Sequence, residues 1–233
     1  NLYTVTATRP EKGNVLEVHL KPDSGEIFPY RAGQFVFLRL YDPQYSPEEH
    51  PFSLISAPQD RDKVALAIKD SGDYTHRFQT LQPGVKASVE GPHGGMWHVQ
   101  EGIHDKTVSM VMFAGGIGIT PMLGILENSA YLQFPNKTVL AWSLKDRNEY
   151  GFTEKLQAFK EKLPDFRLVP FFANESGFLD EGKIDKILKD NEIRYEAAEY
   201  LLCGPPPFMN AVEAALLKKG IPKDRIHYET FGL

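Results

Sequence analysis

The chain has 233 residues, enough for one large domain or two of ordinary size, and combines 42% hydrophobic residues with a formal net charge of −5. It has no basic run typical of nucleic-acid binding, and its seven His residues lack metal-ligand spacing. No apolar run approaches the roughly 20 residues that cross a bilayer. We therefore expect neither nucleic acid nor a metal ion as a partner.

The single Cys203 excludes an internal disulfide and is typical of a protein from a reducing compartment. The sequence has no signal peptide, and it begins at Asn1 without an initiator Met. We therefore expect a soluble fragment that could belong to a longer protein.

The first part of the chain, residues 2–92, consists of short strand-like runs separated by turn residues, with one helix-like segment at 75–81. Regular short strands of this kind indicate an antiparallel barrel or sandwich. The turn at 90–95 is of a kind that closes a domain. The strand-like runs lie at 2–6, 15–20, 34–40, 52–55, 63–69 and 85–90.

One motif of this part, His50-Pro-Phe-Ser53, combines a potential cation, a rigid turn, an aromatic ring and a hydroxyl. Neighbouring residues of a strand face opposite sides. Phe52 and Ser53 can therefore line one pocket only if the strand bends or its backbone contributes. Taken alone, the motif is most simply a strand start with a core Phe.

A second motif, Lys69 to His76, places Gly72 and Thr75 where a strand ends and a helix begins. This arrangement suits a phosphate group, because backbone N–H groups at a helix start attract anions. A turn with Thr75 as the helix cap is the plainer interpretation, and the two roles are compatible.

Strands and helices alternate in the second part of the chain, after Gly95. This rhythm predicts a parallel, doubly wound sheet with ligands at the carboxyl ends of its strands. The expected strands are 108–114, 138–142, 166–170, 199–203 and 225–230, and the expected helices are 121–133, 152–162, 179–189 and 207–219.

Three turns follow such strand ends, at 115–118, 142–147 and 203–207, and could form a single nucleotide site. In the first of them, glycines would let backbone N–H groups approach a pyrophosphate at a helix start. Its spacing, Gly115-Gly116-x-Gly118, does not fit G-x-G-x-x-G. Alone, it is equally compatible with an ordinary tight turn.

Four motifs run through the chain in order: His50-Pro-Phe-Ser53, Gly115-Gly-Ile-Gly-Ile-Thr-Pro121, Cys203-Gly-Pro-Pro-Pro207 and Glu229-Thr-Phe231. Together they resemble the ferredoxin–NADP reductase superfamily over essentially the whole chain. More narrowly, they resemble the dehydrogenase domain of NADPH oxidases and ferric reductases, of bacterial type, because the usual Arg-x-Tyr-Ser flavin motif is replaced by His-Pro-Phe-Ser. The resemblance implies an antiparallel FAD-binding β-barrel domain, 1–104, followed by a doubly wound NAD(P)H-binding α/β domain, 105–233.

The resemblance implies that the barrel binds FAD. His50 would replace the family's Arg near the FAD phosphates, Phe52 would flank the isoalloxazine or ribityl region, and Ser53 would hydrogen-bond near flavin N5. Because neutral His lacks the permanent charge and bidentate fork of Arg, phosphate binding would depend more on backbone N–H groups and Thr75. The other residues implied to hold FAD are Pro51, Ala67, Ile68, Lys69 and Gly72.

The resemblance also implies a nicotinamide site. Cys203 would shape the hydride-transfer pocket without acting as a nucleophile, although a buried small hydrophobe is the simpler interpretation of the residue alone. Phe231 would cover the flavin face and move for the nicotinamide to stack; otherwise it would be a core aromatic. The dinucleotide loop is matched by Gly115, Gly116, Gly118 and Thr120, with Gly204 and Pro205 beside Cys203. Ser53, Thr120, Cys203 and Phe231 are the implied catalytic residues.

The choice of nucleotide depends on the turn after the second strand of the α/β part, where cations favour a 2′-phosphate and an acid favours NAD. This turn offers Ser143, Lys145 and Arg147 against the single Asp146. We predict NADPH, with NADH tolerated.

The implied function is hydride transfer from NADPH to FAD, then single-electron transfer to haem in a transmembrane domain of the same polypeptide. Oxygen would be reduced to superoxide by a protein whose FAD domain lies on the cytoplasmic face of the membrane. The alternatives are a soluble FAD-dependent NAD(P)H reductase serving ferredoxin, a haem protein or free flavin, and a ferric reductase module. A further alternative is an FAD-binding electron-transfer subunit without turnover.

Overall fold

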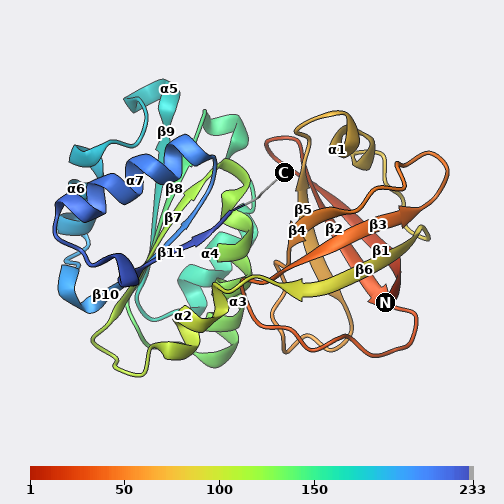
Figure 1. The fold of residues 1–233 in the computed structure, drawn as a ribbon, viewed down its shortest axis with the longest axis horizontal. Helices are drawn as coiled ribbons and strands as arrows, with labels where there is room; N and C mark the ends of the chain where they lie inside the picture. The colour runs from red at the N-terminus through yellow and green to blue at the C-terminus, as the bar shows by residue number, and fades with distance from the viewer. Residues whose placement is uncertain (231–233) are drawn as a thin grey trace.

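The computed structural model describes residues 1–230, and its two units lie side by side, each built on its own sheet (Figure 1). The first sheet has six strands in the order β4-β3-β6-β1-β2-β5, and its pairs are antiparallel. The second has five parallel strands in the order β11-β10-β7-β8-β9. The predicted fold class, a β-barrel followed by a parallel α/β sheet, is confirmed.

The first unit is a barrel whose edge strands β4 and β5 approach each other at the bridge between Leu54 and Leu66. Alternate residues of β2 fill its interior, among them Val18 and Leu20, while Glu17 on the same strand points out of the barrel core. Its elements are β1 (Leu2–Glu11), β2 (Val15–Pro22), β3 (Phe35–Tyr41), β4 (His50–Ser53), β5 (Val64–Lys69), α1 (Asp73–Phe78) and β6 (Lys86–His93).

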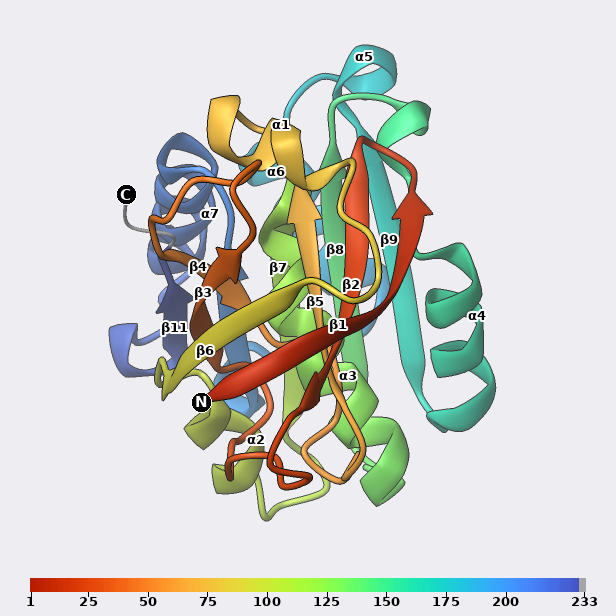
Figure 2. The same ribbon diagram turned by 90° about the vertical axis from the view of Figure 1, so that its right-hand side faces the viewer.

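The second unit is a three-layer arrangement in which α6 and α7 cover one face of the parallel sheet, while α3 and α4 cover the face toward the barrel (Figures 1 and 2). Every residue of the central strand β7 is buried, as expected for a strand covered on both faces. The strands are β7 (Ser109–Gly115), β8 (Thr138–Leu144), β9 (Phe166–Phe172), β10 (Ala198–Cys203) and β11 (Ile226–Glu229). The helices are α3 (Ile119–Leu132), α4 (Thr153–Lys162), α5 (Ala173–Ser176), α6 (Glu181–Asp190) and α7 (Pro206–Lys218). Within residues 1–230, none of the helices is both long and apolar enough to cross a bilayer.

The helix α2 (Trp97–Gly102) connects the two sheets and was not predicted. Its Val99 belongs to the same apolar cluster as α3, and Gln100 Nε2 donates to Ser129 Oγ of that helix at 2.6 Å. The predicted domain boundary at 104/105 falls after α2, between β6 and β7. In its contacts, α2 joins the two units: Val99 and Gln100 pack on α3, while the barrel residue Arg31 lies 3.9 Å from the Trp97 ring centroid and 3.5 Å from the Glu101 carboxylate.

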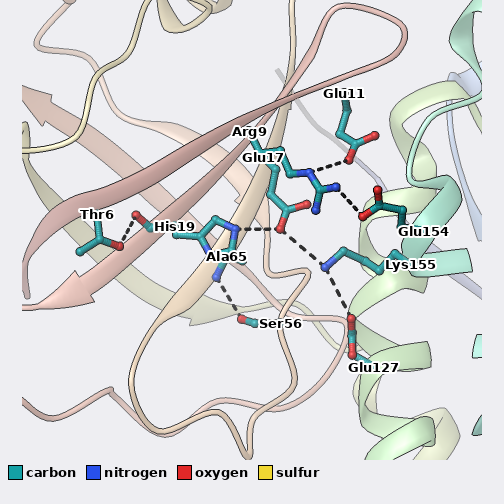
Figure 3. A network of polar contacts seen from close by, with 10 residues as sticks. All are labelled: Thr6, Arg9, Glu11, Glu17, His19, Ser56, Ala65, Glu127, Glu154 and Lys155. Atoms are coloured by element: carbon teal, nitrogen blue, oxygen red, sulfur yellow. Dashed lines mark hydrogen bonds and ion pairs between the residues drawn. The ribbon is translucent and has the colours of Figure 1, made fainter. Parts of the chain in front are cut away.

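The interface between the two units combines apolar packing with ion pairs. Val15, Ala65 and Ala67 on the outside of the barrel share one buried cluster with α3 and α4. Beside this cluster, the Glu17 carboxylate lies 2.9 Å from His19 Nε2 and 3.6 Å from Lys155 Nζ of α4 (Figure 3). This buried charge pairing favours one relative placement of the two units, and with it one geometry for any site between them.

Candidate functional site

A cavity of about 340 Å³ lies between the barrel and the turn that follows β7. Two motifs that are separate in sequence, 50–53 and 69–75, meet at its wall, and two residues of the second unit complete it. The barrel contributes His50, Pro51, Phe52, Ser53, Ala67, Lys69, Ser71, Gly72, Asp73, Tyr74 and Thr75, and the second unit contributes Ile117 and Thr120.

Ser53 lies at the base of this wall and is 2% exposed. Its Oγ is buried and makes no hydrogen bond to any part of the chain that the structure describes. Phe52 and Ser53 both line the cavity although they are neighbours on β4, which ends at Ser53. A buried hydroxyl without a partner is costly unless a ligand satisfies it, so Ser53 fits a bound group that carries hydrogen-bonding atoms.

The side wall of the cavity is aromatic. The His50 ring stacks on the Tyr74 ring with centroids 3.6 Å apart, and the ring centroids of Phe52 and Phe78 are 5.9 Å apart. Tyr74 OH donates to the carbonyl of Glu48 at 3.0 Å, and burial, followed by the Glu48 carboxylate, raises the pKa of Tyr74 to about 12. Flat apolar walls with few polar groups suit the ring system of a flavin. The sequence reasoning missed Tyr74, although it stands beside Thr75 in the second motif.

The turn between β5 and α1 forms the polar end of the cavity. The Ser71 N–H donates to Thr75 Oγ1 at 2.8 Å, and Thr75 Oγ1 donates to the carbonyl of Gly72 at 3.3 Å. Among the described residues that line the cavity, Lys69 at the end of β5 is the one with a permanent positive charge. Ile68 points the other way, into the barrel core, so any contact it makes with a ligand would come from its main chain.

The predicted glycine turn follows β7 as a short 3-10 segment, Gly116–Gly118, that leads into α3. Gly116 has a φ of +54°, in the left-handed region that glycine tolerates best. A Cβ on Gly118 would overlap the carbonyl of Cys203 and lie 2.8 Å from Gly204 N. The turn after β7 and the turn after β10 therefore pack directly on each other, and Pro205 lies against Gly115.

Two of the implied catalytic residues lie at these turns. Thr120 is 2% exposed, lines the cavity, and donates to the carbonyl of Ile117 at 3.0 Å. Cys203 is fully buried, and burial, with the Glu229 carboxylate as a second cause, raises the pKa of its thiol. A protonated, buried thiol is consistent with a residue that shapes a pocket and does not act as a nucleophile. Phe231 lies outside the described residues.

Glu229 is a buried carboxyl to which the sequence reasoning gave no role. It lies beside Cys203 in the register of β10 and β11, and its Oε2 is buried without a hydrogen-bond partner within residues 1–230. Burial raises its pKa to about 7. One feature of the sequence could have pointed to Glu229: it stands at the end of the last parallel strand, and ligands of such sheets bind at the carboxyl ends of the strands.

The pKa of Glu229 leads to a prediction about stability. In the unfolded chain its pKa is near the ordinary 4.5, so between that pH and about 7 the folded chain holds more protons. The stabilising contribution is therefore complete below the unfolded pKa and is lost as pH rises through about 7. In the unaltered chain, Glu229 should lower the unfolding free energy by up to roughly 3 kcal/mol between pH 5 and pH 8. In Glu229→Gln this part of the decrease should be absent. Urea unfolding at both pH values would measure it, and an unchanged fall in the variant would contradict the assignment.

The turn that was predicted to select the nucleotide follows β8, whose Ser143 pairs in register with Gly115. The structure thus places it at the same edge of the sheet as the glycine turn. Lys145 is exposed there. Arg147 binds Glu175 with two hydrogen bonds, of 2.6 and 3.0 Å, and its guanidinium lies 4.6 Å from the Phe172 ring centroid. Glu175, which the sequence reasoning did not consider, therefore neutralises the Arg147 cation.

Comparison with known proteins matches both units to families. Residues 2–113 match the FAD-binding domain family, and residues 112–214 match the oxidoreductase NAD-binding domain family. The ferredoxin reductase component of 3-ketosteroid-9-alpha-monooxygenase from Rhodococcus rhodochrous is 31% identical over 99% of this chain and 64% of its own length. A flavohemoprotein from Rhizobium meliloti is 25% identical over 99% of this chain and 60% of its own.

Among solved structures, a flavohemoglobin from Malassezia yamatoensis with bound FAD and heme superposes with a TM-score of 0.82, at 23% identity. The similarity covers 99% of this chain and 60% of that one. At this identity it supports the fold alone. The chain spans about three fifths of the length of the curated relatives named here.

The two matched domains, the barrel and the parallel sheet identify the class: the chain belongs to the ferredoxin–NADP reductase superfamily and carries its FAD-binding and NAD-binding domains. Its cofactors are FAD and a nicotinamide nucleotide. It is a pyridine-nucleotide and FAD oxidoreductase module of that superfamily.

Proposed function

We propose that this chain takes hydride from NADPH and passes electrons singly to a haem or iron–sulfur partner protein. The observation that carries the proposal is the shared cavity: Ser53 of the flavin motif and Thr120 of the nicotinamide loop line the same space. Two nucleotides bound in these two units would meet there. Relatives named as a ferredoxin reductase component and as flavohemoproteins favour this alternative over the NADPH-oxidase interpretation.

The chain's own residues would bind and orient the cofactor. When bound, FAD supplies the redox chemistry, since it accepts two electrons as hydride and gives them up one at a time. His50 and Tyr74 provide a flat wall, and the Ser53 hydroxyl provides a hydrogen bond deep in the cavity. Lys69 and the turn at 71–75 lie where phosphate oxygens could be held. Glu229, with a pKa of about 7, can hold or release a proton at neutral pH.

The acceptor is tested by reoxidation. The FAD-loaded chain is reduced anaerobically by NADPH and then mixed with a [2Fe-2S] ferredoxin, a haem protein or oxygen. We expect a protein acceptor to reoxidise the flavin faster than oxygen at matched concentration. If oxygen is fastest and superoxide forms in stoichiometric amount, the proposal is wrong and the oxidase interpretation takes its place.

Nucleotide preference is expected to depend on Glu175. Because Glu175 occupies the Arg147 guanidinium, Glu175→Gln would release that cation for a 2′-phosphate. We expect kcat/KM for NADPH to rise roughly fivefold relative to NADH, while Arg147→Ala should lower the same ratio. Glu181→Gln is the matched control, since it removes another exposed ion pair, with Lys218, between α6 and α7. A ratio unchanged in both Glu175→Gln and Arg147→Ala would exclude this turn from nucleotide selection.

A further inference from the structure

Lys69 lies between two hollows in the structure. On one side it lines the cavity assigned to FAD, together with Phe52 and Thr75. On the other side it lines a second, smaller cavity behind the glycine turn, together with Gly116 and Glu149. Its ammonium group is thus placed at the boundary between the flavin unit and the nicotinamide unit.

Glu149 holds Lys69 from the opposite unit and uses both carboxylate oxygens. Its Oε1 accepts a hydrogen bond from Lys69 Nζ at 2.9 Å, and its Oε2 accepts one from the Lys145 N–H, also at 2.9 Å. The side chains of Lys69 and Glu149 are only 26% and 21% exposed. One carboxylate therefore joins the wall of the FAD cavity to the turn that carries Lys145 and Arg147.

The hydrogen bonds that Glu149 accepts favour its charged form. Burial alone would raise the pKa of Glu149, but the hydrogen bonds from Lys69 and from the Lys145 amide outweigh it, so the pKa is lowered overall. Glu149 is therefore ionised at neutral pH and neutralises Lys69. The Gly13 turn of the barrel packs closely against the main chain of Glu149, since a Cβ on Gly13 would lie 3.2 Å from the Glu149 Cα.

A phosphate group that engages Lys69 from the FAD cavity competes with the Glu149 carboxylate for the same ammonium. Once released, the negative charge of Glu149 would lie unneutralised beside a turn that has to accept a second anionic nucleotide. Its hold on the Lys145 amide would change at the same time. The unneutralised carboxylate makes the second binding event less favourable.

We propose that Glu149 is a positioning residue that, through Lys69, couples the two nucleotide sites so that each dinucleotide weakens the binding of the other. The proposal rests on the proposed function, because it requires FAD in the barrel and NADP⁺ at the second unit. The coupling is reciprocal, so it can be measured from either site.

The test is the dissociation constant of FAD from the holoprotein, measured by the fluorescence of released FAD with and without saturating NADP⁺. We expect NADP⁺ to raise this constant about fivefold or more in the unaltered chain, within the usual range of such couplings. In Glu149→Gln, and separately in Lys69→Met, the ratio should fall to near one. Glu154→Gln is the control, because it removes another ion pair between the units, with Arg9, at an exposed position; it should keep the full ratio.

The ratio is the FAD dissociation constant with NADP⁺ divided by the constant without it. A ratio of one or below in the unaltered chain would overturn the proposal. An undiminished ratio in Glu149→Gln would overturn it as well. Each member of the ion pair is replaced in its own variant, so the test does not fail if one variant misfolds. A purely structural role of Glu149 would change the melting temperature without removing the NADP⁺ effect. The same holoprotein is also mixed anaerobically with NADPH. Absence of flavin reduction would count against the proposed function, whereas reduction without coupling would count against Glu149 alone.

Discussion

Replacing Gly118 with Ala is expected to abolish tight binding of the nicotinamide nucleotide and to destabilise the fold. The added methyl group would overlap the carbonyl of Cys203 and lie 2.8 Å from Gly204 N, and both are main-chain atoms. The Gly204 turn has little room to move away, because Gly115 already packs against the Gly204 main chain. Overpacking of this kind costs about 1–3 kcal/mol or more. The two turns would separate, and the edge of the sheet that receives the nucleotide would change shape.

Calorimetric titration with NADP⁺ and urea unfolding measure the two effects of Gly118→Ala. We expect the dissociation constant to rise at least about tenfold, since 1.4 kcal/mol corresponds to a factor of ten. Gly102→Ala, at the end of α2, is the matched control, because a Cβ there meets no atom within 4 Å. If Gly118→Ala matched this control in both measurements, the close packing of the two turns would not be needed for binding.

Replacing Ser53 with Ala is expected to slow the reduction of bound FAD by NADPH about 100-fold. The Ser53 hydroxyl is buried in the cavity wall and has no partner in the described protein, so a ligand is the group it can serve. Loss of one hydrogen bond directed at the place where charge develops typically costs a factor of about 100 to 1000 in rate. The variant loses one oxygen atom, so the fold should remain intact.

Stopped-flow absorbance under anaerobic conditions gives the reduction rate for Ser53→Ala. Ser24→Ala serves as control, because Ser24 lies in an exposed turn and, within residues 1–230, its hydroxyl bonds only to the main chain of Glu26. An unaltered reduction rate in Ser53→Ala, with FAD still bound, would show that the hydroxyl does not act on the reacting flavin. Ser53 would then be a structural residue of β4.

Much of the fold could be predicted because the signals for it are local. The fully apolar run that became β7, the glycines after it and the start of α3 are written in consecutive residues, and so is the change from short strands to strand–helix alternation. Thr75 and Ser53 could also be singled out from neighbouring residues. The helices α2 and α5, of six and four residues, were not predicted, since helices this short show little of a helical period.

The parts of the site that escaped prediction depend on contacts between distant segments. Arg147 was predicted as a cation that favours a 2′-phosphate, whereas its ion pair with Glu175, which β9 and α5 bring against it, was not predicted. The stacking of His50 on the Tyr74 ring of α1 was not predicted. The raised pKa of Glu229 comes from burial at the edge of the parallel sheet. In each case the contact joins residues more than 20 positions apart or the effect arises from tertiary burial, so neighbouring residues could mark the position but not the contact or the pKa shift.

In the proposed reaction this chain moves hydride from a nicotinamide nucleotide to FAD. This transfer is tested most directly by reconstituting the purified chain with FAD, mixing it with NADPH without oxygen, and following the flavin absorbance by stopped flow. We expect the oxidised flavin band to bleach completely, and more slowly when the transferred hydrogen of NADPH is deuterium. A chain that holds FAD yet keeps its oxidised spectrum with both NADPH and NADH would contradict it.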